Sequence, residues 1–275
     1  MSLQGTQFEG MADNTFRAFR TLRPGVAWVE AQLQDFAYPA HSHEHVCVGL
    51  MLDGEKSSRY GLRRHTVRRG DVLLVNPGEV HDGHPSGWCG RRYSMLEIEP
   101  ATFRRICFDA IGRDWVEFQQ PVLRDPKARR ALSAWLTSLK GTDAFAESEA
   151  STMLLGLVSA NGDRPRGQSA AGDLAAKISL RMRQNRADAD SIGDLAMEIG
   201  ASRYRLIRAF KQSFGLTPED FRRQLRVASA RSLLAGRQRL ADVAADAGFA
   251  DQSHMTREFR RLVGLTPAAY RRAMQ

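Results

Sequence analysis

Residues 215–223 read GLTPEDFRR, and residues 264–272 read GLTPAAYRR. The two stretches lie 49 positions apart, and Phe210 matches Phe259 at the same offset. Further upstream Gly200 matches Gly248, and there the offset is 48. A self-match of this length indicates that the last third of the chain holds one structural unit twice, with one residue inserted in the turn of the second copy.

Each copy has the pattern of a helix-turn-helix. A short helix ends at Gly200 or Gly248, because glycine readily takes the left-handed conformation that closes a helix. Ser202 and Asp251 follow, and both are residue types that cap the start of a new helix. Residues 219–235 read as one long helix between the copies. The sequence therefore predicts an all-α domain over residues 173–275, made of two helix-turn-helix motifs joined by a long helix.

The second helix of each copy carries a polar and basic face opposite its apolar stripe. Arg and Gln pair bidentately with guanine and adenine edges, and base contacts concentrate in the first turn of a recognition helix. A merely solvated charged face is the alternative for one such helix, but the same pattern occurs here twice in register. We therefore predict double-stranded DNA as a partner and expect contacts from Arg203, Tyr204, Arg205, Arg208, Lys211, Gln252, Ser253, His254, Arg257 and Arg260.

The charge distribution agrees with this prediction. The formal net charge is +9, and residues 173–275 hold 19 Lys and Arg against 11 Asp and Glu, so most of the excess lies there. A basic domain beside a nearly neutral one indicates a polyanionic partner. Three cysteines without a CxxC pair favour the reducing cytoplasm. No apolar run reaches the ~18 residues of a membrane span, so no membrane partner is expected.

The first part of the chain reads differently. Short apolar or alternating segments within residues 26–98 (VAWVEAQL, HVCVGLML, DVLLVN, RYSMLEIE) are broken by turn residues, which predicts a small β-barrel or sandwich. Residues 101–160 have helical spacing of apolar residues. Residues 161–172 are Gly, Pro, Ser and charge, and read as a linker. The fold class is thus α+β multidomain, with an effector-binding and dimerisation domain over residues 12–160.

Three alternating histidines, His41, His43 and His45, stand in the stretch PAHSHEHVCVGL over residues 39–50. A strand would point all three to one face. They span about 13 Å of strand, whereas a Zn–N bond is about 2.0–2.1 Å, so one ion is not expected to bind all three. The best metal set is His41, His43 and His81, but no metal or other cofactor is favoured. An organic-ligand pocket is favoured, lined by His41, His43, His45, His81, Trp88 and Tyr93.

In both parts the chain resembles the AraC/XylS transcriptional regulators. Residues 173–275 resemble their DNA-binding domain through LAMEIGASRYRLIRAFKQSFGLTPEDF, the arginine-rich linker helix and VAADAGFADQSHMTREFRRLVGLTPAAYRR. Residues 39–85 resemble their cupin-like sensor barrel through His41-Ser42-His43, Gly54 and GDVLLVNPGEVH. The carboxylate of metal-binding cupin enzymes is missing from the first of these motifs.

The resemblance assigns roles to the predicted DNA contacts. It places Tyr204, Arg208, Gln252, Ser253 and Arg257 at base-contacting positions. We expect Arg205, Lys211 and Arg260 to hold phosphate, which positions a protein on DNA without specifying sequence. It also implies a homodimer through the helices that follow the barrel, a bacterial source, and RNA polymerase as a further candidate partner.

The function predicted from the sequence is sequence-specific transcription regulation and not enzymatic catalysis. DNA binding is expected to respond to a small molecule in the barrel, for which NPGEVHDG suggests an amino-acid-like compound. The alternatives are a metal-sensing regulator and a metal-dependent cupin enzyme, both using His41, His43 and His81.

Overall fold

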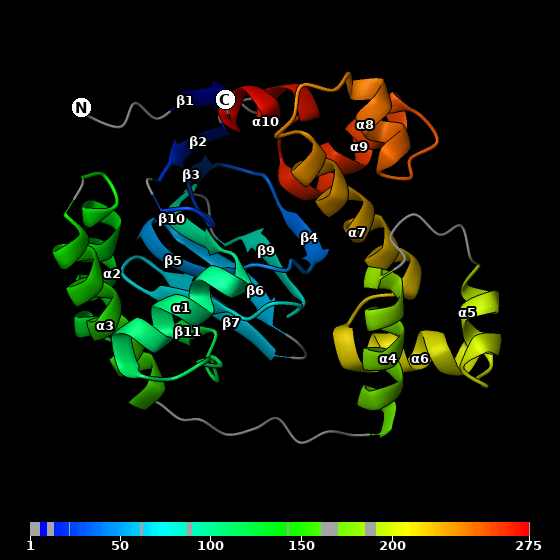
Figure 1. The fold of residues 1–275 in the computed structure, drawn as a ribbon, viewed down its shortest axis with the longest axis horizontal. Helices are drawn as coiled ribbons and strands as arrows, with labels where there is room; N and C mark the ends of the chain where they lie inside the picture. The colour runs from blue at the N-terminus through cyan, green and yellow to red at the C-terminus, as the bar shows by residue number, and fades with distance from the viewer. Residues whose placement is uncertain are drawn as a thin grey trace.

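The computed structural model describes residues 6–9, 14–21, 23–60, 63–86, 90–141, 143–160, 170–184 and 191–274. Two bodies lie side by side in it (Figure 1). We call the first the β-domain, which comprises strands β1–β11 and helices α1–α3, and the second the helical domain, which comprises α4–α10. The mixed α+β class predicted from the sequence is confirmed.

Two antiparallel sheets form the β-domain. The larger has the order β1-β2-β3-β10-β5-β8-β11, and the smaller has the order β4-β9-β6-β7. Apolar side chains of both sheets meet in one buried cluster that includes Leu33, Met51, Tyr60 and Val67. The strands are β1 (Thr6–Glu9), β2 (Thr15–Arg20), β3 (Val26–Leu33), β4 (Tyr38–His41), β5 (Val46–Asp53), β6 (Glu55–Tyr60), β7 (Arg63–Arg68), β8 (Val72–Val75), β9 (His81–Pro85), β10 (Arg91–Ile98) and β11 (Val122–Leu123).

Three helices cover the other face of the larger sheet, as Figure 1 shows. They are α1 (Pro100–Ile111), α2 (Pro126–Ser138) and α3 (Ala144–Ala160). Trp28 of the sheet and Phe103 and Trp135 of the helices are buried together in this second core. These helices hold the sheet rigid on one side, so its other face is free to line a site.

The helical domain has the two predicted helix-turn-helix units. Its helices are α4 (Ala170–Gln184), α5 (Ile192–Glu198), α6 (Arg203–Phe214), α7 (Pro218–Leu233), α8 (Leu240–Asp246), α9 (Gln252–Val263) and α10 (Pro267–Met274). One core surrounds Phe210 and the other surrounds Phe259. The long helix α7 contributes Phe221 to the first core and Val227 to the second, so it fixes the spacing of the two units.

Some expectations differ from the structure. Residues 170–172, expected in the linker, form the first turn of α4, whereas residues 161–169 lie outside the described residues. Strands such as β6 (EKSSRY) were not predicted. The sequence of β6 has no alternation of apolar and polar residues, although every second side chain is buried. Among the described residues, no helix combines the length and apolar character needed to cross a membrane.

Candidate functional site

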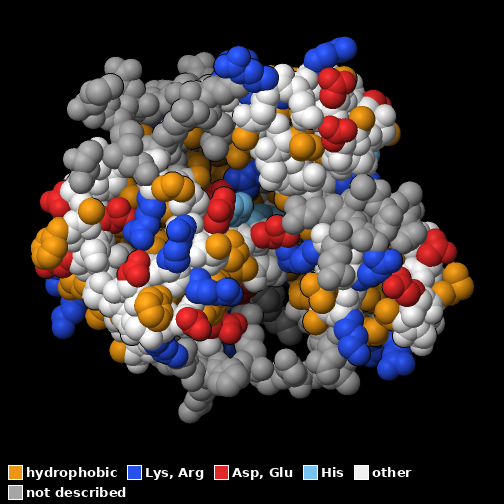
Figure 2. Space-filling model, in the orientation of Figure 1, with side chains coloured by type: hydrophobic (Ala, Val, Ile, Leu, Met, Phe, Trp, Pro, Cys, Tyr) orange, Lys and Arg blue, Asp and Glu red, His pale blue; other side chains and the backbone are white. Residues whose placement is uncertain are grey.

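A cavity of about 190 Å³ lies between the β-domain and the helical domain. Figure 2 shows a depression between the two bodies with histidine side chains at its base. The inner faces of both sheets form most of its wall, and helix α7 and the end of α9 close it. The predicted effector pocket is therefore shared with the DNA-binding half. Its apolar wall includes Phe16, Val29, Val75, Met95, Val227 and Leu262.

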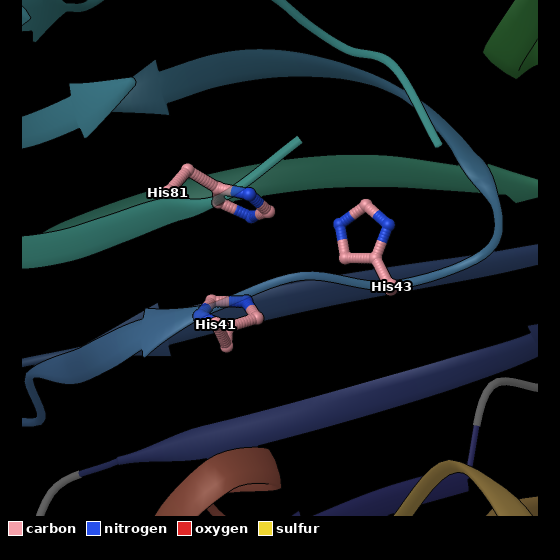
Figure 3. Close-up of side chains that lie close together, drawn as sticks. All are labelled: His41, His43 and His81. Carbon is pink, nitrogen blue, oxygen red and sulfur yellow. The ribbon is translucent and has the colours of Figure 1, made fainter. Parts of the chain in front are cut away.

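His41, His43 and His81 meet at the polar end of this cavity. His41 ends β4, His81 begins β9 as its ladder partner, and His43 lies in the segment that leads to β5. Their ring centroids lie 4.3 Å (His41–His81), 4.9 Å (His43–His81) and 6.0 Å (His41–His43) apart. One nitrogen of each ring lies within 4.8 Å of one in each other ring. Figure 3 shows the three rings turned toward a common space.

Each of the three rings is fixed by a backbone carbonyl two residues away in the chain. The Nδ1 atoms of His41, His43 and His81 lie 2.8, 3.0 and 2.9 Å from the carbonyl oxygens of Pro39, His45 and Glu79. A carbonyl oxygen only accepts, so in these hydrogen bonds Nδ1 carries the proton and donates. Each Nε2 is then left with its lone pair.

Burial keeps these imidazoles neutral near pH 7. It lowers the pKa of His43 to about 4, with the neighbouring His41 adding to the effect. The pKa of His41 is also lowered, and that of His81 lies well below its ordinary value, again chiefly because of burial. Neutral imidazoles offer the lone pairs that both hydrogen-bond donors and metal ions require.

The other predicted pocket residues are His45, Trp88 and Tyr93. His45 is not among the residues that line the cavity in the described part of the chain, so that expectation is wrong. The strand β4 ends at His41 and residues 42–45 turn, which breaks the alternation on which the prediction depended. Trp88 lies outside the described residues. Tyr93 does line the cavity, and its hydroxyl lies 2.9 Å from that of Tyr38.

Lys56 brings a buried positive charge to the cavity. Its ammonium lies 5.6 Å from the centre of the Tyr93 ring. Burial, together with the nearby Arg91, lowers its pKa to about 8. Among the described residues no salt bridge joins this ammonium to a carboxylate, but the charge of the nearby Asp82 raises its pKa and offsets part of the lowering. Asp82 itself accepts from the Arg59 backbone N–H at 2.6 Å and forms ion pairs with Arg59 and Arg64. Lys56 thus lines the cavity as a cation without a direct ion pair to any described residue.

An ion pair ties the helical domain to the cavity wall. Arg231 of α7 donates through Nη2 to Glu97 Oε2 at 2.5 Å, and through Nε to the Tyr270 hydroxyl at 3.1 Å. Burial alone would raise the pKa of Glu97, but the charge of Arg231, followed by the electrostatic interactions with His45 and His43, lowers it to about 2. Glu97, Arg231 and Tyr270 all line the cavity.

A second contact between the domains lies on both sides of His41 in the chain. The buried Gln224 of α7 donates through Nε2 to the carbonyl of Ala40 at 2.9 Å. Its Oε1 accepts from the backbone N–H of Ser42, also at 2.9 Å. Arg183 of α4 adds an ion pair with Glu44 at 2.8 Å. The Ser42 hydroxyl also donates to Gln224 Oε1, at 3.4 Å. All of these Gln224 hydrogen bonds are to the two residues that flank His41.

The first recognition helix, α6, presents the predicted face to solvent. Ser202 caps it by accepting from the Arg205 backbone N–H, and Leu206 and Phe210 are buried beneath it. Tyr204 is 74% exposed. All five predicted contacts of this copy are exposed: Arg203, Tyr204, Arg205, Arg208 and Lys211.

The second recognition helix, α9, has the same construction. Asp251 caps it by accepting from the His254 backbone N–H, and Met255 and Phe259 are buried beneath it. The His254 ring is partly buried and packs edge-on against Phe249 at 5.4 Å, which favours a packing role. The other four predicted contacts, Gln252, Ser253, Arg257 and Arg260, are exposed.

Four residues of the site were not predicted from the sequence: Lys56, Glu97, Gln224 and Arg231. Lys56 and Glu97 are charged residues in strands, where they read as solvent-facing. Gln224 and Arg231 lie in an arginine-rich helix, for which the sequence predicts only the role of joining the two helix-turn-helix motifs. A wall shared by two domains leaves no local pattern, because its residues come from segments that lie far apart in the chain.

A sensor-like β-domain that shares a cavity with two helix-turn-helix units defines a class, the DNA-binding regulators with a ligand-binding domain. Residues 23–158 match the model of the AraC-like ligand binding domain, and residues 195–273 match a helix-turn-helix domain model. The chain belongs to the AraC family of transcription regulators.

Two relatives illustrate this membership. The chain is 26% identical over 227 residues to the uncharacterized HTH-type transcriptional regulator YbfI of Bacillus subtilis, which covers 79% of this chain and 81% of that protein. It is 24% identical over 237 residues to the arabinose operon regulatory protein of Salmonella typhimurium, which covers 82% of each. Both relatives are named as regulators and not as enzymes, in agreement with the predicted function of a regulator.

Solved structures show the same fold. ToxT from Vibrio cholerae O395 superposes with a TM-score of 0.61 at 14% identity, over 92% of this chain and 99% of that one. ToxT with a bound unsaturated fatty acid superposes with a TM-score of 0.58 at 15% identity, over 96% of each chain. The β-domain and the helical domain therefore occur together in experimentally determined structures.

Proposed function

We propose that this regulator binds a specific DNA sequence through α6 and α9, and that a small organic anion in the interdomain cavity sets its DNA affinity. The observation that carries the proposal is the shared wall of that cavity, to which the β-domain contributes His41 and Lys56 and the helical domain contributes Gln224 and Arg231. A ligand held there contacts both halves at once. Its binding therefore depends on how the two domains are docked.

The chemistry of the cavity indicates a carboxylate. Lys56 supplies a buried ammonium without a direct ion pair to any described residue, and a carboxylate is its natural complement. The volume is below the roughly 300–1,000 Å³ of drug-sized sites, so we expect a compact molecule. An amino acid or a short fatty acid has the required anionic head and apolar body. The fatty acid bound by ToxT is a carboxylate of this kind.

The ion pair and hydrogen bonds between the cavity wall and α7 couple ligand binding to the docking of the helical domain. A ligand shifts an equilibrium only as far as its affinities for the two states differ. Glu97 lies in the cavity wall and pairs with Arg231, so a bound anion competes with this carboxylate for the same cations. We infer that ligand binding loosens or re-forms this ion pair and thereby changes how α7 presents α6 and α9. The homodimer and the contact with RNA polymerase remain predictions.

The test combines a carboxylate screen with DNA binding. The full chain is titrated with leucine, lysine, octanoate and palmitoleate, and binding is measured by thermal shift. DNA affinity is then measured with and without the compound that binds. We expect one carboxylate to stabilise the protein and to change DNA affinity by at least roughly fivefold, within the usual range of allosteric coupling.

Lys56→Met should abolish this response. Lys140→Met is the matched control, because Lys140 also lies over an aromatic ring, at 4.9 Å from the centre of Trp28, but does not line the cavity. An equal ligand response in both variants contradicts the role given to Lys56.

A further inference from the structure

The geometry points to a metal site in this cavity. We propose that His41, His43 and His81 bind one divalent transition-metal ion through their Nε2 atoms. The proposal deepens the proposed function and rests on it, because the ion lies in the cavity that we assign to the effector. Its support comes from the orientation, spacing and chemistry of the three rings.

The orientation of the rings is the first observation. All three donate Nδ1–H to a backbone carbonyl, at 2.8 to 3.0 Å. Metal-binding histidines in proteins are held in this way, with one ring nitrogen bonded to a carbonyl or carboxylate and the other free for the ion. One histidine so arranged is ordinary. Three whose rings turn toward one space (Figure 3), each with a nitrogen within 4.8 Å of a nitrogen of the others, form a set of ligands for one ion.

The spacing is the second observation. The three nitrogens lie within 4.8 Å of one another, whereas tetrahedral Zn²⁺ with bonds of about 2.0–2.1 Å holds its nitrogen ligands roughly 3.3 Å apart. Closing this difference takes a movement of at most about 1.5 Å per pair of rings. His43 lies outside the strands, between β4 and β5, so its backbone is not held in a strand ladder.

The donor set selects the class of ion. Three imidazole nitrogens suit Zn²⁺, Co²⁺ and similar ions, whereas Mg²⁺ and Ca²⁺ require oxygen ligands. Cys47 Sγ lies 3.5 Å from His43 Nε2, but Cys47 is not part of the group whose atoms lie within 4.8 Å. Three protein ligands leave one position of a tetrahedral site open. That position faces the cavity, where the carboxylate of an effector completes it.

The site has a direct route to the helical domain. Gln224 of α7 bonds to the backbone of Ala40 and Ser42, the two neighbours of His41. An ion that fixes the ring of His41 therefore also fixes the backbone on which α7 docks. Metal binding and interdomain docking are coupled through two hydrogen bonds.

The experiment uses the full chain after removal of metals with a chelator. Zn²⁺ binding is measured by calorimetry, and Co²⁺ binding by its visible absorption. We expect one ion per chain, and at least roughly 100-fold weaker binding in His43→Gln and His81→Gln. His84→Gln is the matched control, because His84 lies on β9 with His81 but outside the ligand group, and should change the affinity less than about threefold. Absence of stoichiometric binding, or equal affinity in all variants, overturns the metal site.

A second measurement needs no variant. X-ray absorption at the zinc edge of the loaded wild-type protein should show three imidazole nitrogens around the ion, and a shell of sulfur or of oxygen alone overturns the assignment. The two proposals also fail separately. A protein that selects a DNA sequence but binds no Zn²⁺ overturns only the metal site. One that binds Zn²⁺ at these histidines but selects no DNA sequence overturns only the proposed function.

Discussion

Arg231 and Glu97 join the two halves of the molecule through an ion pair at 2.5 Å. Arg231 lies on the helix that connects the two recognition helices, and Glu97 lies on β10, in the wall of the cavity. The helix that joins the two helix-turn-helix units is therefore bound directly to the wall of the cavity. The two are in direct contact, without intervening residues.

Neutralising Glu97 should weaken the docking of the domains in a pH-dependent manner. Its pKa of about 2 lies below the ordinary value of 4.5, so its stabilising contribution is present above pH 4.5 and is lost as pH falls from 4.5 toward 2. We expect Glu97→Gln to lower the free energy of unfolding at pH 7. The gap to wild type should narrow by on the order of 1 kcal/mol at pH 4.

The check is urea unfolding of both proteins at pH 7 and pH 4. Glu97 also raises the pKa values of His41 and His43. Their protonation at pH 4 therefore costs the variant slightly more than wild type and opposes part of the narrowing. A gap that stays constant over this range shows that Glu97 is not held ionised by Arg231.

Removing the Gln224 side chain should free the strand segment that carries His41. Gln224→Ala deletes two hydrogen bonds to backbone groups, and leaving buried polar groups unpaired costs about 1–3 kcal/mol. We expect the amide hydrogens of residues 38–42 to exchange at least roughly tenfold faster, while the core of α9 is unchanged. Hydrogen exchange read by mass spectrometry measures this directly. Gln120→Ala, at an exposed position of the β-domain, is the control and should leave residues 38–42 protected.

The recognition helices should separate base contacts from phosphate contacts. Arg257→Ala and Arg208→Ala should each cost about 1–3 kcal/mol at the cognate site and relax one base position. Lys211→Ala should instead weaken all duplexes similarly and flatten the dependence of affinity on salt. Fluorescence anisotropy with cognate and random duplexes makes the comparison.

A control in the β-domain removes the same charge far from the DNA. Arg104→Ala, at an exposed position of α1, should leave both affinities unchanged. If Arg257→Ala weakens cognate and random DNA equally, then Arg257 holds phosphate and does not read a base.

The helical domain was predictable because its signals are local. Gly200 and Gly248 have φ values of 65° and 78°, so the glycines expected to close helices do take the left-handed conformation. Ser202 and Asp251 accept the capping hydrogen bonds that were predicted from their residue types. The repeated pattern then placed both recognition helices without any knowledge of the fold.

The cavity was predictable only in part. The structure brings together His41, His43 and His81, the set that the cupin-like motif indicates. The bond-length argument only excluded one ion bound to all three strand histidines. His45 was not placed correctly, because a strand that ends at His41 cannot carry the alternation further. Lys56 lies in a strand of polar residues, and its burial depends on the opposite sheet and on α7. Contacts between segments that lie far apart in the chain leave no trace in either segment alone.

The most direct measurement is selection of DNA sequences from a random duplex pool by the full-length protein. The two recognition helices are fixed on one connecting helix, so we expect enrichment of a site with two recognised segments about one helical turn, roughly 34 Å, apart. Affinity for that site should exceed affinity for random DNA by at least about 10³-fold. Enrichment of no sequence at any salt concentration, with equal affinity for all duplexes, would contradict sequence-specific regulation by this protein.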